Sequence, residues 1–192
     1  MPETEESPAS SVNGDVEAQE FTVSLLAANI YGTLFGLLPG LLFLALFYFT
    51  WRGRDVQAPP EGFGIFQTLL VLFAGIVVHE LLHGLGWMVF AGVPRSNIKI
   101  GVKWKVLTPF AHSSARMPIR GYRWGGFLPG LVLGILPSLL AIAIGSVGLI
   151  GFGFFFTITA GGDFLLLWLL RHVPGHAEVA DHPSEMGAVV YV

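Results

Sequence analysis

The chain has 192 residues, of which 53% are hydrophobic and 12% are charged, and its mean hydropathy is +0.68. Soluble domains carry about 25% charged residues, so this composition excludes an ordinary soluble globule and a disordered chain. The net charge of −3 lacks the basic excess that nucleic-acid binding requires. The absence of cysteine excludes disulfides, thiolate metal sites and cysteine nucleophiles. The composition is that of an integral membrane protein in a lipid bilayer.

The first segment of the chain is acidic and carries no Lys or Arg. Its acidic residues alternate with Ser, Pro and Gly, and they are Glu3, Glu5, Glu6, Asp15, Glu17 and Glu20. A segment of this composition cannot bury enough apolar surface to fold. We therefore predict a disordered acidic tail over residues 1–22, followed by a single membrane-embedded domain over residues 23–192.

Four apolar segments are long enough to cross a bilayer whose hydrocarbon core is about 30 Å thick. They predict membrane-spanning helices over residues 25–50, 64–92, 127–147 and 152–171. The last two form one apolar stretch that is too long for a single span, and the glycines near its middle predict a turn. The predicted fold class is an all-α integral membrane protein with about four transmembrane helices.

The basic residues are distributed unevenly between the two sides of these helices. Only Arg52 and Arg54 lie between the first two predicted spans, whereas Arg171 follows the fourth. The other seven lie in the segment 94–126, and they are Arg95, Lys99, Lys103, Lys105, Arg116, Arg120 and Arg123. Because positive charge is retained on the cytoplasmic side, we predict a multi-pass cell-membrane protein with both termini and this basic segment in the cytoplasm.

Two segments outside the spans have the pattern of strands. Residues 98–106 alternate Lys with Ile, Val and Trp, which predicts a half-buried strand. Residues from about 116 to 120 could pair with it, giving a small cytoplasmic β-hairpin between the second and third helices. The edge of this hairpin could hold an extended substrate segment, or its basic face could rest on anionic lipid. The C-terminal tail, residues 172–192, ends in a β-prone segment that could add a third strand.

Gly32, Gly36 and Gly40 recur at intervals of four in the first predicted span. Small residues at this spacing allow another helix to approach closely. The neighbour could be a helix of the same chain, or it could belong to a second copy in a homo-oligomer.

The second predicted span contains the segment His79-Glu80-Leu81-Leu82-His83. Residues four apart share a helix face, so His79 and His83 can bind one metal ion, and Glu80 can act as a catalytic base on a water molecule. Zn²⁺ suits imidazole ligands and leaves a position open for water in catalytic sites. Ionisable groups inside a membrane are costly and are functional by default, although these three could also form a polar contact between helices.

Asp163 is the only other ionisable residue within a predicted span, and it lies at a similar depth to the two histidines. It is therefore the candidate third zinc ligand. Alternatively, Asp163 could be a neutral buried acid or could hydrogen-bond to the backbone. His112 in the basic segment is the competing candidate for the third ligand.

With these residues, the chain resembles the putative zincin peptidase family, whose layout is similar to that of site-2 protease type intramembrane metallopeptidases. The resemblance covers about residues 64–191. It rests on His79 to Gly84, the basic segment with Thr108-Pro109-Phe110, Gly162-Asp163, and Asp181-His182-Pro183 with Gly187. It implies His79, His83 and Asp163 as zinc ligands and Glu80 as the catalytic base. Thr157-Ile158-Thr159-Ala160 stands where site-2 proteases carry an Asn-x-x-Pro element.

The sequence thus predicts an intramembrane or membrane-associated zinc metallopeptidase that acts on a membrane protein or peptide. Two other functions are open. The chain could be a non-catalytic membrane module, either a pseudo-protease or a metal-binding protein that acts through protein–protein interaction. It could also be a metal or proton carrier, although four spans without an inverted repeat do not favour one.

Overall fold

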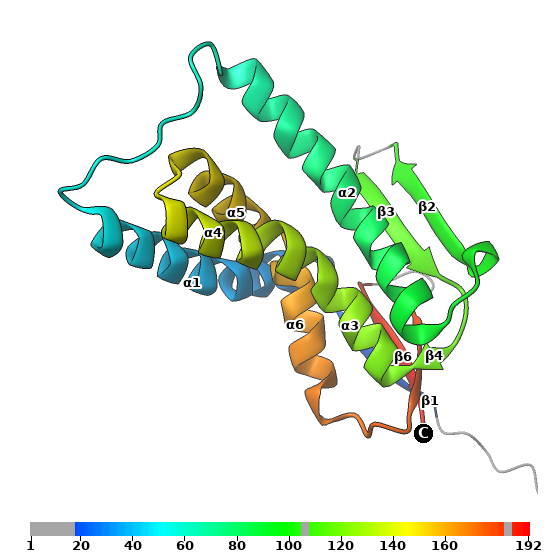
Figure 1. The fold of residues 1–192 in the computed structure, drawn as a ribbon. Helices are drawn as coiled ribbons and strands as arrows, with labels where there is room; N and C mark the ends of the chain where they lie inside the picture. Colours follow the sequence, from blue (N-terminus) through cyan, green and yellow to red (C-terminus); the bar gives the residue numbers. More distant parts are fainter. Residues whose placement is uncertain (1–17, 105–107, 183–185) are drawn as a thin grey trace, which may run out of the picture.

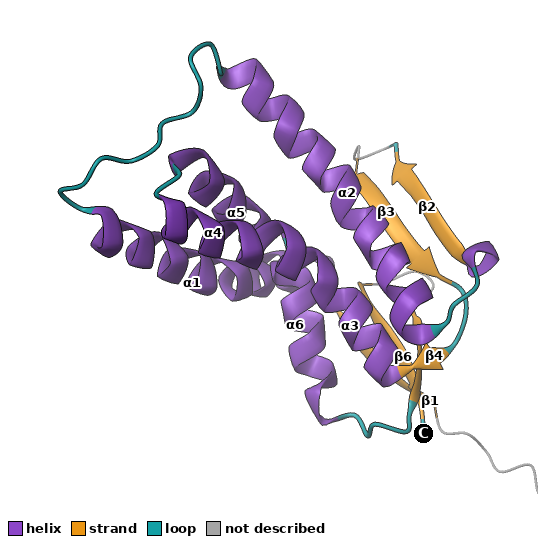
Figure 2. Cartoon of the chain, in the orientation of Figure 1, coloured by secondary structure: helices purple, strands orange, loops and turns teal. Residues whose placement is uncertain are grey.

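The structure is a computed structural model that describes residues 18–104, 108–182 and 186–192 (Figure 1). Helices make up most of this part of the chain, and the strands gather where α2 ends and α3 begins (Figure 2). The expectation of an all-α protein with one small β-hairpin therefore needs one correction: the described residues are mostly helical but form two small β-sheets.

The first two long helices match their predicted spans closely. They are α1 (Leu25–Trp51) and α2 (Ile65–Ala91), each of 27 residues. The hydroxyl of Ser24 accepts a hydrogen bond from the amide of Ala27 and caps the start of α1. Gly92 ends α2 with a φ of 67°, a left-handed conformation that favours glycine. At 1.5 Å per residue, each helix is about 40 Å long.

The third helical stretch begins earlier than predicted, at residue 119 instead of 127. It consists of α3 (Ile119–Pro129), a π-helical segment η2 (Gly130–Ile135) and α4 (Leu136–Ile144). The first turns of α3 bury Ile119 and Tyr122 although they also carry two arginines. An amphipathic helix tolerates charges on its solvent-exposed face. A prediction based on apolar residues alone therefore put the start of this helix too late and made the basic segment 94–126 too long.

The fourth predicted span, residues 152–171, is in fact a bent pair of helices that starts earlier. The turn falls at Gly145, whose φ is 75°, and the Ser146 hydroxyl then caps α5 (Val147–Thr159). A bend of 43° separates α5 from α6 (Gly161–Leu169), which runs into the short helix η3 (Leu170–His172). A left-handed glycine followed by a capping serine explains why the chain reverses there.

Among the described residues, three helices are long and apolar enough to cross a membrane, or four if the bent pair forms one span. Along α1 and α2 most apolar side chains are exposed, including Leu38 at 69% and Phe66 at 73%. Apolar surface of this extent on a long helix fits contact with lipid. The structure is consistent with a multi-pass membrane protein.

A four-stranded antiparallel sheet joins the two ends of the chain. Its strand order is β1 (Ala18–Val23), β6 (Met186–Tyr191), β5 (Glu178–Asp181) and β4 (Met117–Pro118). The predicted disorder of residues 1–22 is thus wrong for 18–22, because the edge of β6 supplies hydrogen-bond partners to this β-prone segment. Residues 1–17 lie outside the described part of the chain.

The predicted hairpin between the second and third helices is present, but its second strand differs. After the short helix η1 (Arg95–Asn97), β2 (Ile98–Lys103) pairs with β3 (Thr108–Ser113). Residues 117 and 118 pair with β5 instead, and the C-terminal strand joins the other sheet. Pro109 is compatible with β3 because the amides of Ala111 and Ser113, which share its edge, point away from β2.

The glycines of α1 pack against α5 and α6 of the same chain. A Cβ atom at Gly36 would lie 2.5 Å from the carbonyl oxygen of Thr157, and one at Gly161 would lie 2.0 Å from that of Gly32. Backbone contact this close leaves no room for a Cβ atom at Gly36 or at Gly161. The face of Gly32, Gly36 and Gly40 is therefore occupied within the chain, while a homo-oligomer through it stays a prediction.

Candidate metal centre

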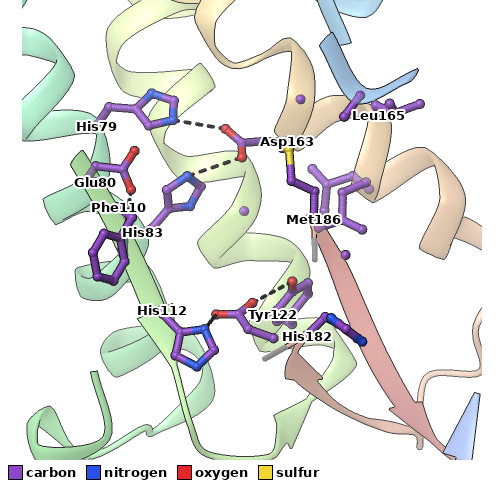
Figure 3. Close-up of a pocket in the computed structure, with 18 of the residues that line it drawn as sticks. His79, Glu80, His83, Phe110, His112, Tyr122, Asp163, Leu165, His182 and Met186 are labelled. Carbon is purple, nitrogen blue, oxygen red and sulfur yellow. Dashed lines mark hydrogen bonds and ion pairs between the residues drawn. The ribbon is translucent and has the colours of Figure 1, made fainter. Parts of the chain in front are cut away.

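Three candidate ligands from α2 and α6 meet inside the helical bundle (Figure 3). His79 and His83 lie one turn apart on the buried face of α2, with exposed fractions of 5% and 8%. Asp163 stands in the first turn of α6, directly after the bend. Nε2 of His79 lies 3.1 Å from Oδ2 of Asp163, and Nε2 of His83 lies 3.3 Å from Oδ1.

The donor set fits a zinc ion. One ligand atom from each of the three residues lies within 4.8 Å of the others, and no other such group occurs among the described residues. Two imidazoles and a carboxylate are a ligand set of catalytic zinc sites, which leave a further position for water. The prediction that these three residues lie close together in the fold is confirmed. Zinc binding itself stays a prediction.

A backbone carbonyl orients one of the histidines. Nδ1 of His83 lies 3.1 Å from the carbonyl oxygen of Gly125 on α3. A carbonyl can only accept, so Nδ1 carries the proton and Nε2, which faces Asp163, has a free lone pair for a metal. The ring of His83 also stacks on Trp87, with centroids 5.7 Å apart and 23° between the planes. The tautomer and the ring orientation of His83 are thus both suited to a ligand.

The Glu80 carboxylate lies beside the rings of His79 and His83 and next to strand β3 (Figure 3). Its Oε2 accepts a hydrogen bond of 2.7 Å from the amide of Ala111. This contact holds the carboxylate beside the three candidate ligands without making it one of them. Glu80 therefore has the position that a base acting on a nearby water requires.

All four residues line one cavity of about 700 Å³. Its lining also includes apolar side chains such as Phe110, Leu165 and Met186. An apolar cavity with a few convergent polar groups is typical of a site for an organic substrate.

His112, the competing candidate for the third ligand, lines the same cavity but lies away from the two histidines of α2 (Figure 3). Its Nδ1 lies 3.6 Å from Oδ2 of Asp181 at the end of β5. The structure therefore brings Asp163, and not His112, to His79 and His83.

Sequence reasoning missed two residues of the cavity, Tyr122 and Asp181. The Tyr122 hydroxyl donates a hydrogen bond of 2.8 Å to Oδ1 of Asp181. Burial raises the pKa of Asp181, although the amide of Ser113 and the Tyr122 hydroxyl act in the opposite direction. Asp181 belongs to the Asp181-His182-Pro183 segment used for the resemblance, whereas no pattern in the sequence pointed to Tyr122.

The fold and the site thus define a class: a bundle of apolar helices in which a His-Glu-x-x-His helix and an aspartate form a candidate metal centre. The chain belongs to the putative zincin peptidase family, whose model matches residues 72–177, more than half of its length. The matched segment contains both histidines, Glu80 and Asp163. The comparisons with curated proteins and with solved structures gave no match.

Proposed function

We propose that the chain is a zinc metallopeptidase that hydrolyses peptide bonds at or within the cytoplasmic half of a membrane. The observation that carries the proposal is the convergence of Asp163 on His79 and His83 beside Glu80. Membership of the putative zincin peptidase family supports the same class of reaction. In the proposed topology, with both termini in the cytoplasm, β2 and β3 lie on the cytoplasmic side.

The roles of the side chains follow from their positions. His79, His83 and Asp163 hold the zinc ion, and Glu80 is the catalytic base. When bound, zinc supplies a Lewis acid that makes a water molecule easier to deprotonate. Glu80 takes the proton from that water and returns it to the leaving amine. The amide of Ala111 keeps the Glu80 carboxylate in place for both transfers.

The proposed substrate is a membrane protein or an apolar peptide. The cavity beside the zinc ligands is lined by apolar side chains from several elements, including Leu165 of α6 and Met186 of β6. Apolar residues that flank a scissile bond would therefore bury surface on binding. The order of a histidine-bearing helix, a further helical span and an aspartate-bearing helix is similar to that of site-2 proteases.

The experiment compares Glu80→Gln with the wild-type chain, purified whole in detergent. We expect both proteins to contain about one zinc ion per chain. Hydrolysis of labelled casein and of a labelled single-span peptide should fall at least about 100-fold in the variant, because a positioned base contributes about 10²–10⁴ to the rate. Glu61→Gln, at an exposed position between α1 and α2, is the matched control and should retain full activity.

The outcome separates the proposed peptidase from a non-catalytic module. If Glu80→Gln keeps its zinc and cleaves as fast as wild type, Glu80 is not the base and the peptidase proposal fails. A metal-binding role would then remain for His79, His83 and Asp163.

A further inference from the structure

Asp181 is a partly buried carboxylate that no step of the proposed reaction uses. It ends β5, its side chain is 13% exposed, and it lines the same cavity as the zinc ligands. Each of its oxygens accepts a hydrogen bond of 2.8 Å, Oδ2 from the amide of Ser113 and Oδ1 from the hydroxyl of Tyr122. These donors lie on two different elements, β3 and α3, so this one carboxylate joins the two.

The contact to β3 leads to Glu80. The amides of Ala111 and Ser113 lie two residues apart and so point to the same edge of β3. Ala111 donates to Glu80 and Ser113 donates to Asp181, at 2.7 and 2.8 Å. The two carboxylates thus bind successive amides of one strand edge. Asp181 fixes the part of β3 from which Ala111 reaches Glu80.

The contact to α3 leads to His83. One turn after Tyr122, the carbonyl of Gly125 lies against Nδ1 of His83. The Tyr122 ring also stacks on Trp87, with centroids 6.1 Å apart and 15° between the planes, and Trp87 stacks in turn on His83. Fixing the Tyr122 hydroxyl therefore restrains both groups that orient the His83 imidazole.

We infer that Asp181 is a positioning residue, which holds β3 and α3 in the arrangement that aims Glu80 at the reaction centre and His83 at the zinc ion. The inference rests on the proposed function of those two residues. Some residues do not bind the metal but hydrogen-bond to its ligands and orient them. Mutation of such residues typically lowers metal affinity or activity about 10- to 100-fold. Asp181 acts through groups of this kind, so we expect effects at the lower end of that range.

The experiment uses the whole chain in detergent, with Co²⁺ as a spectroscopic probe in place of zinc. Asp181→Ala removes both acceptor oxygens. Asp181→Asn keeps one oxygen that can accept from the Ser113 amide, and its side-chain NH₂ can donate to the hydroxyl oxygen of Tyr122. Tyr122→Phe breaks only the contact to α3 and retains the aromatic stack. Glu178→Gln, at an exposed position on the same strand, is the matched control.

We expect the dissociation constant for Co²⁺ to rise about 10-fold in Asp181→Ala and the visible absorption of the bound ion to change. Asp181→Asn should recover most of the affinity. Tyr122→Phe should show a smaller loss, and Glu178→Gln none. With casein, kcat should fall in the same order while KM changes little. A protein with a merely structural Asp181 would show lower thermal stability but the same Co²⁺ spectrum and the same kcat.

Tyr122→Phe retains every buried ring and carries the test if Asp181→Ala does not fold. If Tyr122→Phe, together with Asp181→Ala where that variant folds, matches wild type in Co²⁺ affinity, spectrum and kcat, the inference is overturned while the proposed function stands. If the wild-type chain itself binds no Co²⁺, the proposed function is overturned and the inference with it.

Discussion

Asp163 and Asp181 are two partly buried carboxylates in one cavity, and their partners give them different chemistry. Asp163 lies against two imidazole nitrogens, each of which can bind a metal ion. Asp181 lies against an amide and a phenol, which donate hydrogen bonds and bind no zinc, with His112 further away at 3.6 Å. The chemistry open to each carboxylate therefore depends on the side chains and backbone groups that surround it, since both are partly buried.

The position of Asp163 depends on the glycine contact between α1 and the bend before α6, whereas the hydrogen-bond donors to Asp181 lie on β3 and α3. Gly36→Ala places a methyl group 2.5 Å from the Thr157 carbonyl oxygen and should push the helices apart. Overpacking of this kind costs about 1–3 kcal/mol of unfolding free energy. We expect lower thermal stability in detergent together with weaker zinc binding, measured by competition with a chelator.

Gly151→Ala is the matched control, because nothing lies within 4 Å of the Cβ atom it would add to α5. Alanine is also the better helix former, so this variant should be as stable as wild type. Equal stability and zinc affinity for Gly36→Ala and Gly151→Ala would contradict the role given to the α1 contact.

A smaller expected effect is the contribution of Asp181 to the pH dependence of stability. Burial raises the pKa of Asp181 in the folded chain, whereas in an unfolded chain the pKa of an aspartate is about 3.9. Below both values the carboxyl is neutral in both states and has no effect on the pH dependence. As pH rises through the interval between them, the carboxyl ionises in the unfolded chain but keeps its proton in the folded chain, so the folded chain loses stability relative to Asp181→Asn.

Thermal unfolding of the two proteins with a chelator present, from about pH 4 to about pH 7, measures this difference. We expect the unfolding free energy of wild type to decline relative to that of Asp181→Asn over this range. Parallel pH profiles would show that Asp181 has the same pKa in the folded and unfolded chains.

The sequence predicted the parts of the molecule that depend on local pattern. Long apolar runs located α1 and α2, and the His-Glu-x-x-His spacing placed two histidines on one helix face. Asp163 was found because an acid inside an apolar segment is costly. Each of these signals lies within one segment of the chain, so no knowledge of the tertiary structure was needed.

The features that were missed depend on contacts between distant segments. β1 forms because β6 lies beside it, 163 or more residues later in the chain. The start of α3 depends on the burial of Tyr122, and the role of Asp181 depends on partners 59 and 68 residues away. Local composition carries no information about such partners, so Asp181 entered the sequence analysis only through the family resemblance.

The most direct test of the account is the zinc content of Asp163→Ala and His112→Ala, each purified whole in detergent beside the wild-type chain. Elemental analysis should find about one zinc ion per chain in wild type and in His112→Ala. In Asp163→Ala the zinc should be lost on dialysis, because two histidines remain where three ligands are needed. Stoichiometric zinc in Asp163→Ala, or its loss from His112→Ala alone, would contradict the site described for this chain.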